Sequence, residues 1–272
     1  MDERIKILFL AADPVDTSHL RLGTEIKEIN KKMQSALHRD SFELVSEWAV
    51  TAADLREALL RHCPQIVHFS GHGSKSGCLV VEDESGKARM IDREALTALF
   101  QILRDNIRIV VLNACYSKPQ ADAIGQVVDY TIGMSTTISD KAAILFSATF
   151  YSALGFGRTV KEAFELARIA LHMDFPQEHK TPWLLAQESI DRASGYLIEQ
   201  PISPARAEIL ALKERWGKEP DPWKRYWLAI SVGDIGGRQA MEILQSMKAR
   251  ESDEFAQMGV EEALRAACKP IL

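Results

Sequence analysis

Residues 107–117 read Ile-Arg-Ile-Val-Val-Leu-Asn-Ala-Cys-Tyr-Ser, and the prediction of the fold starts from this stretch. Five of its first six residues are aliphatic, and four of those five are β-branched. Such a run, closed by small residues, predicts a strand that is buried on both faces of a parallel sheet. The residues after such a strand lie at the carboxyl edge of the sheet, where open α/β folds carry their chemistry. Cys115 stands there, either as a small buried hydrophobe or as a nucleophile.

A second short strand is predicted over residues 65–70, and it ends in Gly71-His72-Gly73. The two glycines allow a sharp turn and leave the imidazole uncrowded. Between the two strands lie a polar stretch and a predicted helix over residues 92–104, which is enough chain for the right-handed crossover between parallel neighbours. His72 and Cys115 would then project from one edge of the sheet, as a thiol nucleophile and its general base do.

Ser70-Gly71-His72-Gly73 and Asn113-Ala114-Cys115 resemble the dyad motifs of caspase-like cysteine peptidases, and the chain around them is more similar still to the bacterial CHAT-domain branch of that clan. The resemblance covers about residues 1–190, and its motifs occur in order at 7–14, 20–22, 67–73, 111–117, 132–134, 138–143, 150–151 and 157–160. It implies that His72 and Cys115 are catalytic, that the backbone N–H groups of Gly73 and Cys115 form the oxyanion hole, and that the six-stranded sheet ends in an antiparallel strand. The animal caspase signature has glutamine at the position of Asn113 and glycine at that of Ser117. Cleavage after aspartate is therefore not implied.

Asp140 allows two interpretations. As an acidic residue at the start of a predicted helix, it could simply stabilise the helix dipole. The resemblance to separase-like relatives implies instead that Asp140 binds a basic side chain before the scissile bond, which predicts cleavage after Arg or Lys.

Activation is expected to leave the chain uncut. The stretch 116–120 after the nucleophile is short, and its only basic residue, Lys118, precedes Pro119, so the bond between them is a poor cleavage site. We therefore expect a bound partner or assembly to switch the peptidase on. The family context suggests bacterial defence, such as antiviral defence, or signalling.

Strands and helices alternate as far as residue 186, which predicts a three-layer α/β sandwich. Strands are expected over 5–11, 42–49, 65–70, 107–112, 129–133 and 183–186, with a hairpin at 78–81 and 88–91. Helices are expected over 18–38, after Thr51, and over 92–104, 121–127, 139–154 and 159–173. The peptidase domain is thus assigned to residues 1–192 and a linker to 193–203. Residues 204–272 form four helical segments that weakly resemble HEAT repeats and would offer a docking surface.

The amino-acid composition narrows the class of protein further. The chain has 272 residues, 46% hydrophobic and 26% charged, with 33 basic and 38 acidic residues that leave a net charge of −5. This balance gives no sign of a nucleic-acid or membrane partner. The cysteines (Cys63, Cys78, Cys115, Cys268) have no metal-ligand spacing and no disulfide pattern, so a reducing, cytoplasmic setting is expected. Residues 5–12 are too few for a membrane span and lack the layout of a signal peptide.

Other interpretations of these residues compete with the peptidase. His68 and His72 could suggest a metal pair, but that spacing suits a helix and not a strand end, so His68 is interpreted as a buried structural residue. The carboxylates of residues 82–84 could bind calcium but are more simply solvated. We therefore expect a protein substrate and an activating partner, with no cofactor and no metal. A catalytically silent caspase-like binding module and a receiver- or TIR-like domain remain as alternatives.

Overall fold

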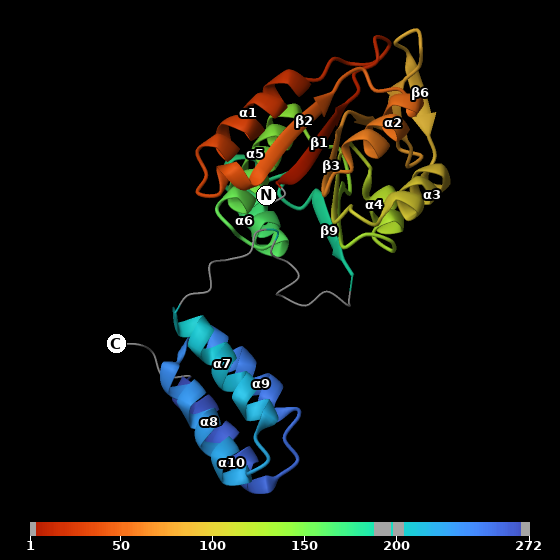
Figure 1. Cartoon of the computed structure of the whole chain (residues 1–272). Helices are drawn as coiled ribbons and strands as arrows, with labels where there is room; N and C mark the ends of the chain where they lie inside the picture. Colours follow the sequence, from red (N-terminus) through yellow and green to blue (C-terminus); the bar gives the residue numbers. More distant parts are fainter. Residues whose placement is uncertain (1–3, 188–196, 198–203, 268–272) are drawn as a thin grey trace. The chain divides into compact units, whose positions relative to one another are not determined.

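The computed structural model describes residues 4–187, Leu197 and 204–267. The chain divides into two compact units, 1–199 and 200–272 (Figure 1). Of the linker expected over 193–203, only Leu197 lies within the described residues. The two units are therefore described separately.

A six-stranded sheet in the order β2-β1-β3-β7-β8-β9 forms the middle layer of the first unit. Its strands are β1 (Ile5–Ala11), β2 (Phe42–Glu47), β3 (Ile66–Ser70), β7 (Ile109–Asn113), β8 (Tyr130–Met134) and β9 (Pro182–Ala186). The first five run parallel, and β9 pairs antiparallel with β8. Every residue of β3, β7 and β8 is buried, as continuous apolar runs predict for strands covered on both faces. The predicted sheet, including its antiparallel last strand, is confirmed.

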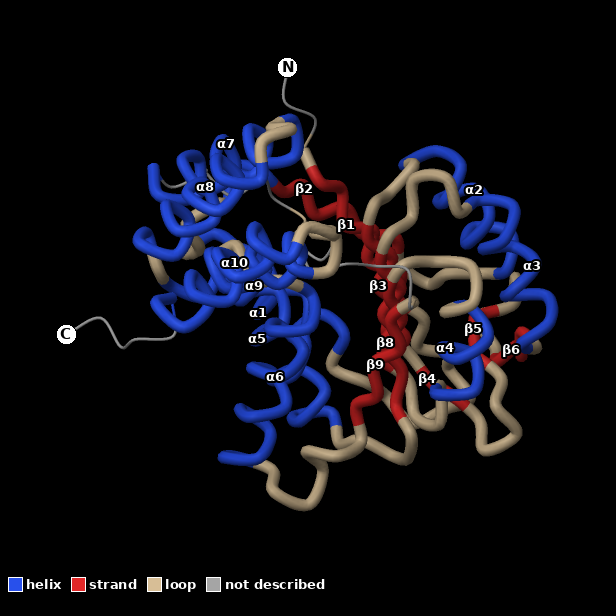
Figure 2. Tube along the Cα trace, turned by 90° about the horizontal axis from the view of Figure 1, so that it is seen from below, coloured by secondary structure: helices blue, strands red, loops and turns tan. Residues whose placement is uncertain are grey.

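Helices cover both faces of this sheet (Figure 2). One face carries α1 (Leu22–Gln34), α5 (Asp140–Gly155) and α6 (Val160–Asp174), and the other carries α2 (Ala52–His62), α3 (Arg93–Leu103) and α4 (Lys118–Ile124). The sheet separates two hydrophobic cores, and alternate residues of a strand pack into one or the other. Phe9 packs into the first core and Leu10 into the second. The predicted three-layer sandwich is confirmed.

One local prediction is corrected, and another is extended. The first helix was expected from residue 18, but α1 begins at Leu22, and residues 13–21 form a loop over the sheet edge. The hairpin of β5 (Leu79–Glu82) and β6 (Ala88–Ile91) gains a third strand, β4 (His72–Gly73), which pairs with β5. Within the described residues, no helix is both long and apolar enough to cross a membrane.

The second unit is a bundle of four helices: α7 (Pro204–Lys218), α8 (Pro222–Ile235), α9 (Gly237–Lys248) and α10 (Glu254–Ala267). Its core contains Ala229, Leu244 and Val260, all fully buried. Arg225 ties the start of α8 to the loop before α10, because its guanidinium donates to both carboxylate oxygens of Glu251, at 2.8 and 3.0 Å. This bidentate pair fixes the loop before α10 against α8 more firmly than a single hydrogen bond would.

Candidate active site

The ends of β3 and β7 bring the predicted dyad to one edge of the sheet. The two strands are parallel neighbours, and their register pairs Ser70 with Asn113. His72 and Cys115 each stand two residues beyond this pair, so both lie at the carboxyl edge, at neighbouring strand ends. The side chain of His72 is 20% exposed and Cys115 is half-buried, so both are within reach of solvent.

Gly73 has its backbone directly against Cys115. A Cβ built on Gly73 would overlap the carbonyl oxygen of Cys115 and would also crowd Ala114. Only glycine therefore allows the His72 loop and the Cys115 turn to approach this closely. The motif Gly71-His72-Gly73 indicated Gly73 as a site residue, but the sequence did not predict its contact with Cys115.

The hydrogen bond of His72 identifies the tautomer of its ring. Its Nε2 lies 2.8 Å from the carbonyl oxygen of Ser18, and a carbonyl can only accept, so Nε2 carries the proton. In the neutral ring Nδ1 is then the nitrogen with a free lone pair. A carboxylate oxygen of Asp13 lies 3.8 Å from Nε2.

Ser18 reaches His72 because residues 13–21 are a loop and not the start of α1. The carboxylate of Asp13 organises this loop, since it accepts from the backbone N–H of Leu20 at 3.2 Å and contacts Nδ1 of His19 at 3.1 Å. The sequence pattern did not indicate Asp13 and Ser18 as site residues. The position of Asp13, just after β1 at the carboxyl edge of the sheet, was the available signal.

The turn after β7 holds Cys115 in place. Its Sγ lies 3.8 Å from the carbonyl oxygen of Ile138, to which the thiol donates. The next residue, Tyr116, has a φ of 58°, a left-handed conformation that is uncommon for a residue with a side chain. Ser117 stabilises the turn, because its buried hydroxyl donates to Leu112 O at 2.7 Å and accepts from Met134 N–H at 2.9 Å.

Asp140 lies two residues after Ile138, whose carbonyl oxygen contacts Cys115 Sγ. It occupies the first turn of α5, behind the N-cap Ser139, whose hydroxyl accepts from Ala142 N–H. Its carboxylate is also paired within the chain: one oxygen accepts from both the backbone N–H and the Nε of Arg21, each at 3.1 Å. Asp140 therefore has a structural role at the helix start and already holds a cation.

A buried carboxylate, Glu25, lies behind both strand ends. One of its oxygens accepts from Asn113 Nδ2 at 2.6 Å and contacts His68 Nε2 at 3.1 Å, and the other accepts from the Ser70 hydroxyl at 2.5 Å. His68 in turn contacts the Tyr151 hydroxyl through Nδ1, at 3.1 Å. We call these residues the Glu25 network: Glu25, His68, Ser70, Asn113, Ser147 and Tyr151. It joins α1, β3, β7 and α5 immediately below the dyad.

Electrostatics show that Glu25 is held as a carboxylate. Burial raises its pKa, but the hydrogen bond and charge of His68, with the bonds from Ser70 and Ser147, outweigh burial and leave the pKa below its ordinary value of 4.5. Burial, together with the negative charge of Glu25, raises the pKa of Tyr151 well above its usual range, so its phenol stays neutral. The structural role of His68 was predicted from the sequence. Glu25 was not, because an acidic residue on an amphipathic helix ordinarily faces solvent.

The metal interpretations find no geometric support. Both ring nitrogens of His68 are engaged within the Glu25 network, so His68 does not face His72 as a ligand. The described residues contain no group of three or more His, Cys, Asp or Glu side chains placed to hold a metal ion. Within residues 82–84, Glu82 instead accepts from the backbone N–H of Asp13, and Asp83 closes the hairpin turn through Ser85 and Lys87.

Comparison with known families identifies the first unit. The model of the CHAT domain matches residues 11–187. The chain belongs to the CHAT family. Among curated relatives, this CHAT chain is 28% identical over 201 residues to a Roc-COR-CHAT protease of an unknown prokaryotic organism, covering 69% of the chain and 19% of that protein. It is 29% identical over 153 residues to a probable protease of Gillisia limnaea, covering 54% of the chain and 26% of that protein. The CHAT chain thus spans only about a fifth to a quarter of these relatives.

Two solved structures are similar to parts of the CHAT chain. Caspase-1 from Spodoptera frugiperda matches with a TM-score of 0.48 and 10% identity, over 68% of the CHAT chain and 87% of the caspase. A secreted C11 cysteine protease from Bacteroides thetaiotaomicron, solved with an irreversible peptide inhibitor, matches with a TM-score of 0.48 and 11% identity, over 78% and 69% of the two chains.

Proposed function

We propose that this CHAT protein is a cysteine endopeptidase that uses Cys115 as its nucleophile and His72 as its base. The observation that carries the proposal is the orientation of His72: its Nε2 donates to Ser18 O, which leaves Nδ1 to accept a proton, at the strand end beside that of Cys115. The curated relatives are named as proteases, which supports the same activity.

Catalysis would begin with transfer of the Cys115 thiol proton to His72 Nδ1, because the thiolate is the attacking species. The imidazolium formed is stabilised by Ser18 O and by the charge of Asp13. As sulfur adds to the scissile carbonyl, the developing oxyanion would accept from the backbone N–H groups of Gly73 and Cys115. His72 then returns the proton to the leaving amine. Water, with His72 again as base, hydrolyses the resulting thioester.

The amide of Cys115 supports its place in the oxyanion hole. Within the described residues this N–H donates to no acceptor, whereas the neighbouring amides of Tyr116 and Ser117 donate to Thr136 O and Ala114 O. An unpaired amide beside a nucleophile can donate a hydrogen bond to the oxyanion that forms in the transition state. Gly73 presents its backbone to the same turn.

Asp140 is proposed to select a basic residue before the scissile bond. Its carboxylate already binds Arg21, so a guanidinium fits at this position, and the Arg or Lys of a substrate would displace the chain's own cation. The Arg21–Asp140 pair is partly exposed, with side chains 50% and 31% exposed, so its disruption costs little, roughly 0–1 kcal/mol.

The specificity prediction concerns two variants with opposite effects. Asp140→Asn should reduce kcat/KM for Arg and Lys peptides by about 10-fold, because the substrate cation loses its counter-charge. Arg21→Ala should lower KM for the same peptides a few-fold, because the competing cation is removed. A fluorogenic panel that varies Arg, Lys, Asp and Leu before the scissile bond measures both. Preference for Asp or Leu in the wild type would contradict the assignment.

The active chain is predicted to be uncut. The expected loop after the nucleophile is shorter still in the structure, because α4 begins at Lys118. The Lys118 ammonium is 2.8 Å from Asp122 and lies over the Trp183 ring, so the only basic residue there is held in a helix. Active protein analysed by intact mass spectrometry should retain its full length, and Lys118→Ala should leave activity within about two-fold. Activity that appears only after an internal cut would refute this.

We further propose a cytoplasmic role in bacterial defence or signalling, in which a sensor or partner protein docks on the HEAT-like helices and activates the peptidase. The family membership supports this role, and the described cysteines, Cys63, Cys78 and Cys115, are free thiols, as in a reducing compartment. Incubation of wild type and Cys115→Ala with the products of neighbouring genes tests it. A protein that is cut by the wild type and not by Cys115→Ala supports the role.

A further inference from the structure

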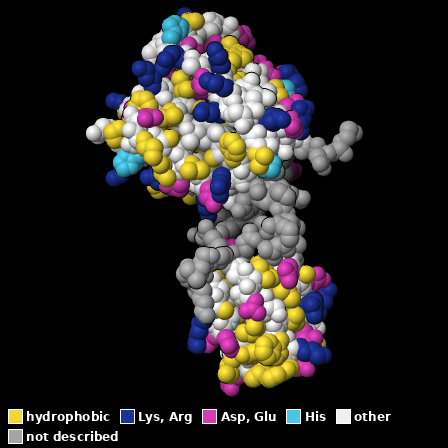
Figure 3. Space-filling view, turned by 90° about the vertical axis from the view of Figure 1, so that its left-hand side faces the viewer, with side chains coloured by type: hydrophobic (Ala, Val, Ile, Leu, Met, Phe, Trp, Pro, Cys, Tyr) yellow, Lys and Arg dark blue, Asp and Glu magenta, His cyan; other side chains and the backbone are white. Residues whose placement is uncertain are grey.

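The helical unit exposes aromatic side chains that its own packing does not use. On its inner side α8 buries Ala229 and Gly233, and a Cβ on Gly233 would overlap Ala263 of α10. On its outer side it presents Trp223 and Trp227, which are 57% and 52% exposed. Phe255 and Met258 of α10 extend this apolar surface, and Figure 3 shows hydrophobic side chains gathered on the helical unit. A contiguous exposed patch of this kind marks an interaction surface in soluble domains.

The aromatic rings are held in fixed positions. Trp223 stacks on Phe255 with ring centroids 5.2 Å apart and planes 13° apart, and it meets Trp227 edge-on at 6.2 Å. Tyr226 stacks on Phe255 at 5.0 Å. Rigid tryptophans lose little conformational entropy on binding, and tryptophan is the residue type most enriched among the anchors of protein interfaces.

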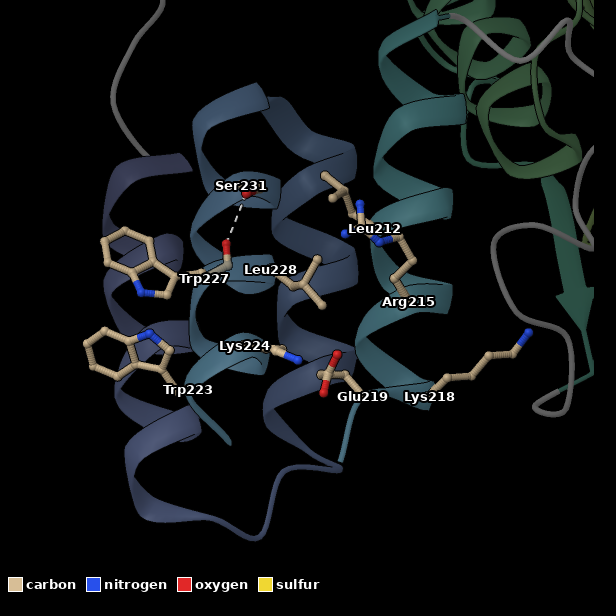
Figure 4. A pocket seen from close by; sticks show the side chains of 9 residues that line it. All are labelled: Leu212, Arg215, Lys218, Glu219, Trp223, Lys224, Trp227, Leu228 and Ser231. Carbon is tan, nitrogen blue, oxygen red and sulfur yellow. Dashed lines mark hydrogen bonds between the residues drawn. The ribbon is translucent and has the colours of Figure 1, made fainter. Parts of the chain in front are cut away.

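A groove of about 580 Å³ between α7 and α8 adjoins these tryptophans (Figure 4). Leu212 and Leu228 supply apolar lining, and Lys224 and Glu219 lie between the two helices. Figure 4 shows the tryptophans projecting from α8 on one side and the cations of α7 on the other. The groove therefore combines an apolar strip with charged walls.

The charge of this groove is predominantly positive. Its lining carries three cations, Arg215, Lys218 and Lys224, against one carboxylate, Glu219. Lys218 pairs with Glu214 at 2.6 Å, whereas Arg215 and Lys224 form no ion pair within the described part of the chain. Two unpaired cations beside an apolar strip complement a ligand that presents carboxylates beside apolar side chains.

We propose that this groove binds an acidic amphipathic helix of a partner protein. Apolar side chains of that helix, three and four residues apart, would cover Trp223 and Trp227, and its carboxylates would pair with Arg215 and Lys224. A nucleic acid is disfavoured, because Glu219 would face its phosphates and the lining contains the apolar Leu212 and Leu228. The inference deepens the proposed activation by a partner, but binding is measured without peptidase activity, so each can fail separately.

The test uses the full chain and fluorescein-labelled helical peptides of about 18 residues, long enough to span several turns. The first peptide carries Glu and Asp on its polar face, and the second carries Lys there and has the same apolar face. The third peptide has the residues of the first in a scrambled order. Fluorescence anisotropy should show the acidic peptide binding at least about tenfold more tightly than the other two. Raising the salt from about 0.05 to about 0.5 M should weaken that binding.

Variants locate the site. The double variant Trp223→Ala, Trp227→Ala should weaken binding of the acidic peptide at least about tenfold. The double variant Arg215→Glu, Lys224→Glu should bind the Lys peptide more tightly than the acidic one. Matched controls in the other unit are Trp183→Ala, 44% exposed, and Lys161→Glu, which should leave binding unchanged. Circular dichroism melting verifies that each variant is folded.

Several results would overturn the proposal. They are equal binding of all three peptides, acidic-peptide binding that survives all four groove substitutions, and a labelled single-stranded RNA that binds through these residues in place of the peptide. Self-association that the tryptophan variants abolish, without peptide binding, would assign the surface to a second copy of the chain and would equally reject the proposed partner.

Discussion

Cys115→Ala is expected to abolish peptide-bond cleavage, with kcat lowered by at least about 10⁴-fold. The alanine has no atom that can form the thioester, whereas the turn that holds it is kept by Ser117 and is independent of the thiol. Initial rates on Arg and Lys fluorogenic peptides, and cleavage of a partner protein followed on gels, measure the effect.

The controls for this prediction are the other described cysteines and the base. Cys63→Ala and Cys78→Ala should keep wild-type rates, because Cys63 ends α2 before β3 begins and Cys78 lies in the turn between β4 and β5. His72→Ala should lose a similar factor to Cys115→Ala, and the double variant should lose little more, since two groups that act as one unit are not additive. Full activity in Cys115→Ala would show that Cys115 is not the nucleophile.

Glu25→Leu is expected to destabilise the first unit by about 3–5 kcal/mol, because removal of the carboxylate leaves buried donors without an acceptor. Asn113, Ser70 and His68 all face Glu25, and the side chain of Glu25 is only 3% exposed. Activity should fall as well, since Ser70 and Asn113 end the strands that carry His72 and Cys115. Urea unfolding at pH 7 measures the free energy of unfolding. Glu28→Leu, on a less buried side of α1, is the matched control and should change it by less than about 0.5 kcal/mol.

The charge of Glu25 gives this prediction a pH dependence. Its folded-state pKa lies below the ordinary value of 4.5, so the carboxylate contributes stability that is fully present above about pH 4.5 and is lost as the pH falls through the folded-state value. Glu25→Gln cannot titrate. The difference in unfolding free energy between wild type and Glu25→Gln should therefore be largest at pH 7 and should shrink at pH 3.5. A constant difference would show that the charge itself contributes nothing.

The sequence predicted most of the fold because its core strands have unmistakable apolar runs. Residues 107–112 and 65–70 were predicted as buried strands, and their parallel pairing in the structure places His72 and Cys115 at one edge of the sheet. Thr51, Asp92 and Ser139 cap their helices through hydrogen bonds that local sequence specifies. The family motifs supplied the antiparallel last strand, which periodicity alone would not give.

The remainder depended on contacts between distant residues. The start of α1 was placed too early, because the side chain of Asp13 and the pairing of Arg21 with Asp140 keep residues 13–21 out of a helix. Ser18 contributes through its backbone carbonyl, which the identity of the residue does not reveal. Glu25 looked like one of several acids on α1, and only the fold shows that His68, Ser70 and Asn113 converge on it.

The central claim is that Cys115 attacks as a nucleophile with His72 as its base, and covalent labelling tests it most directly. Wild-type protein is incubated with a peptidyl acyloxymethyl ketone that ends in Arg, and the modified residue is mapped by mass spectrometry. We expect one label per chain, on Sγ of Cys115, and almost none in His72→Ala. Labelling of Cys63 or Cys78 instead, or equal labelling of Cys115 after His72→Ala, would contradict it.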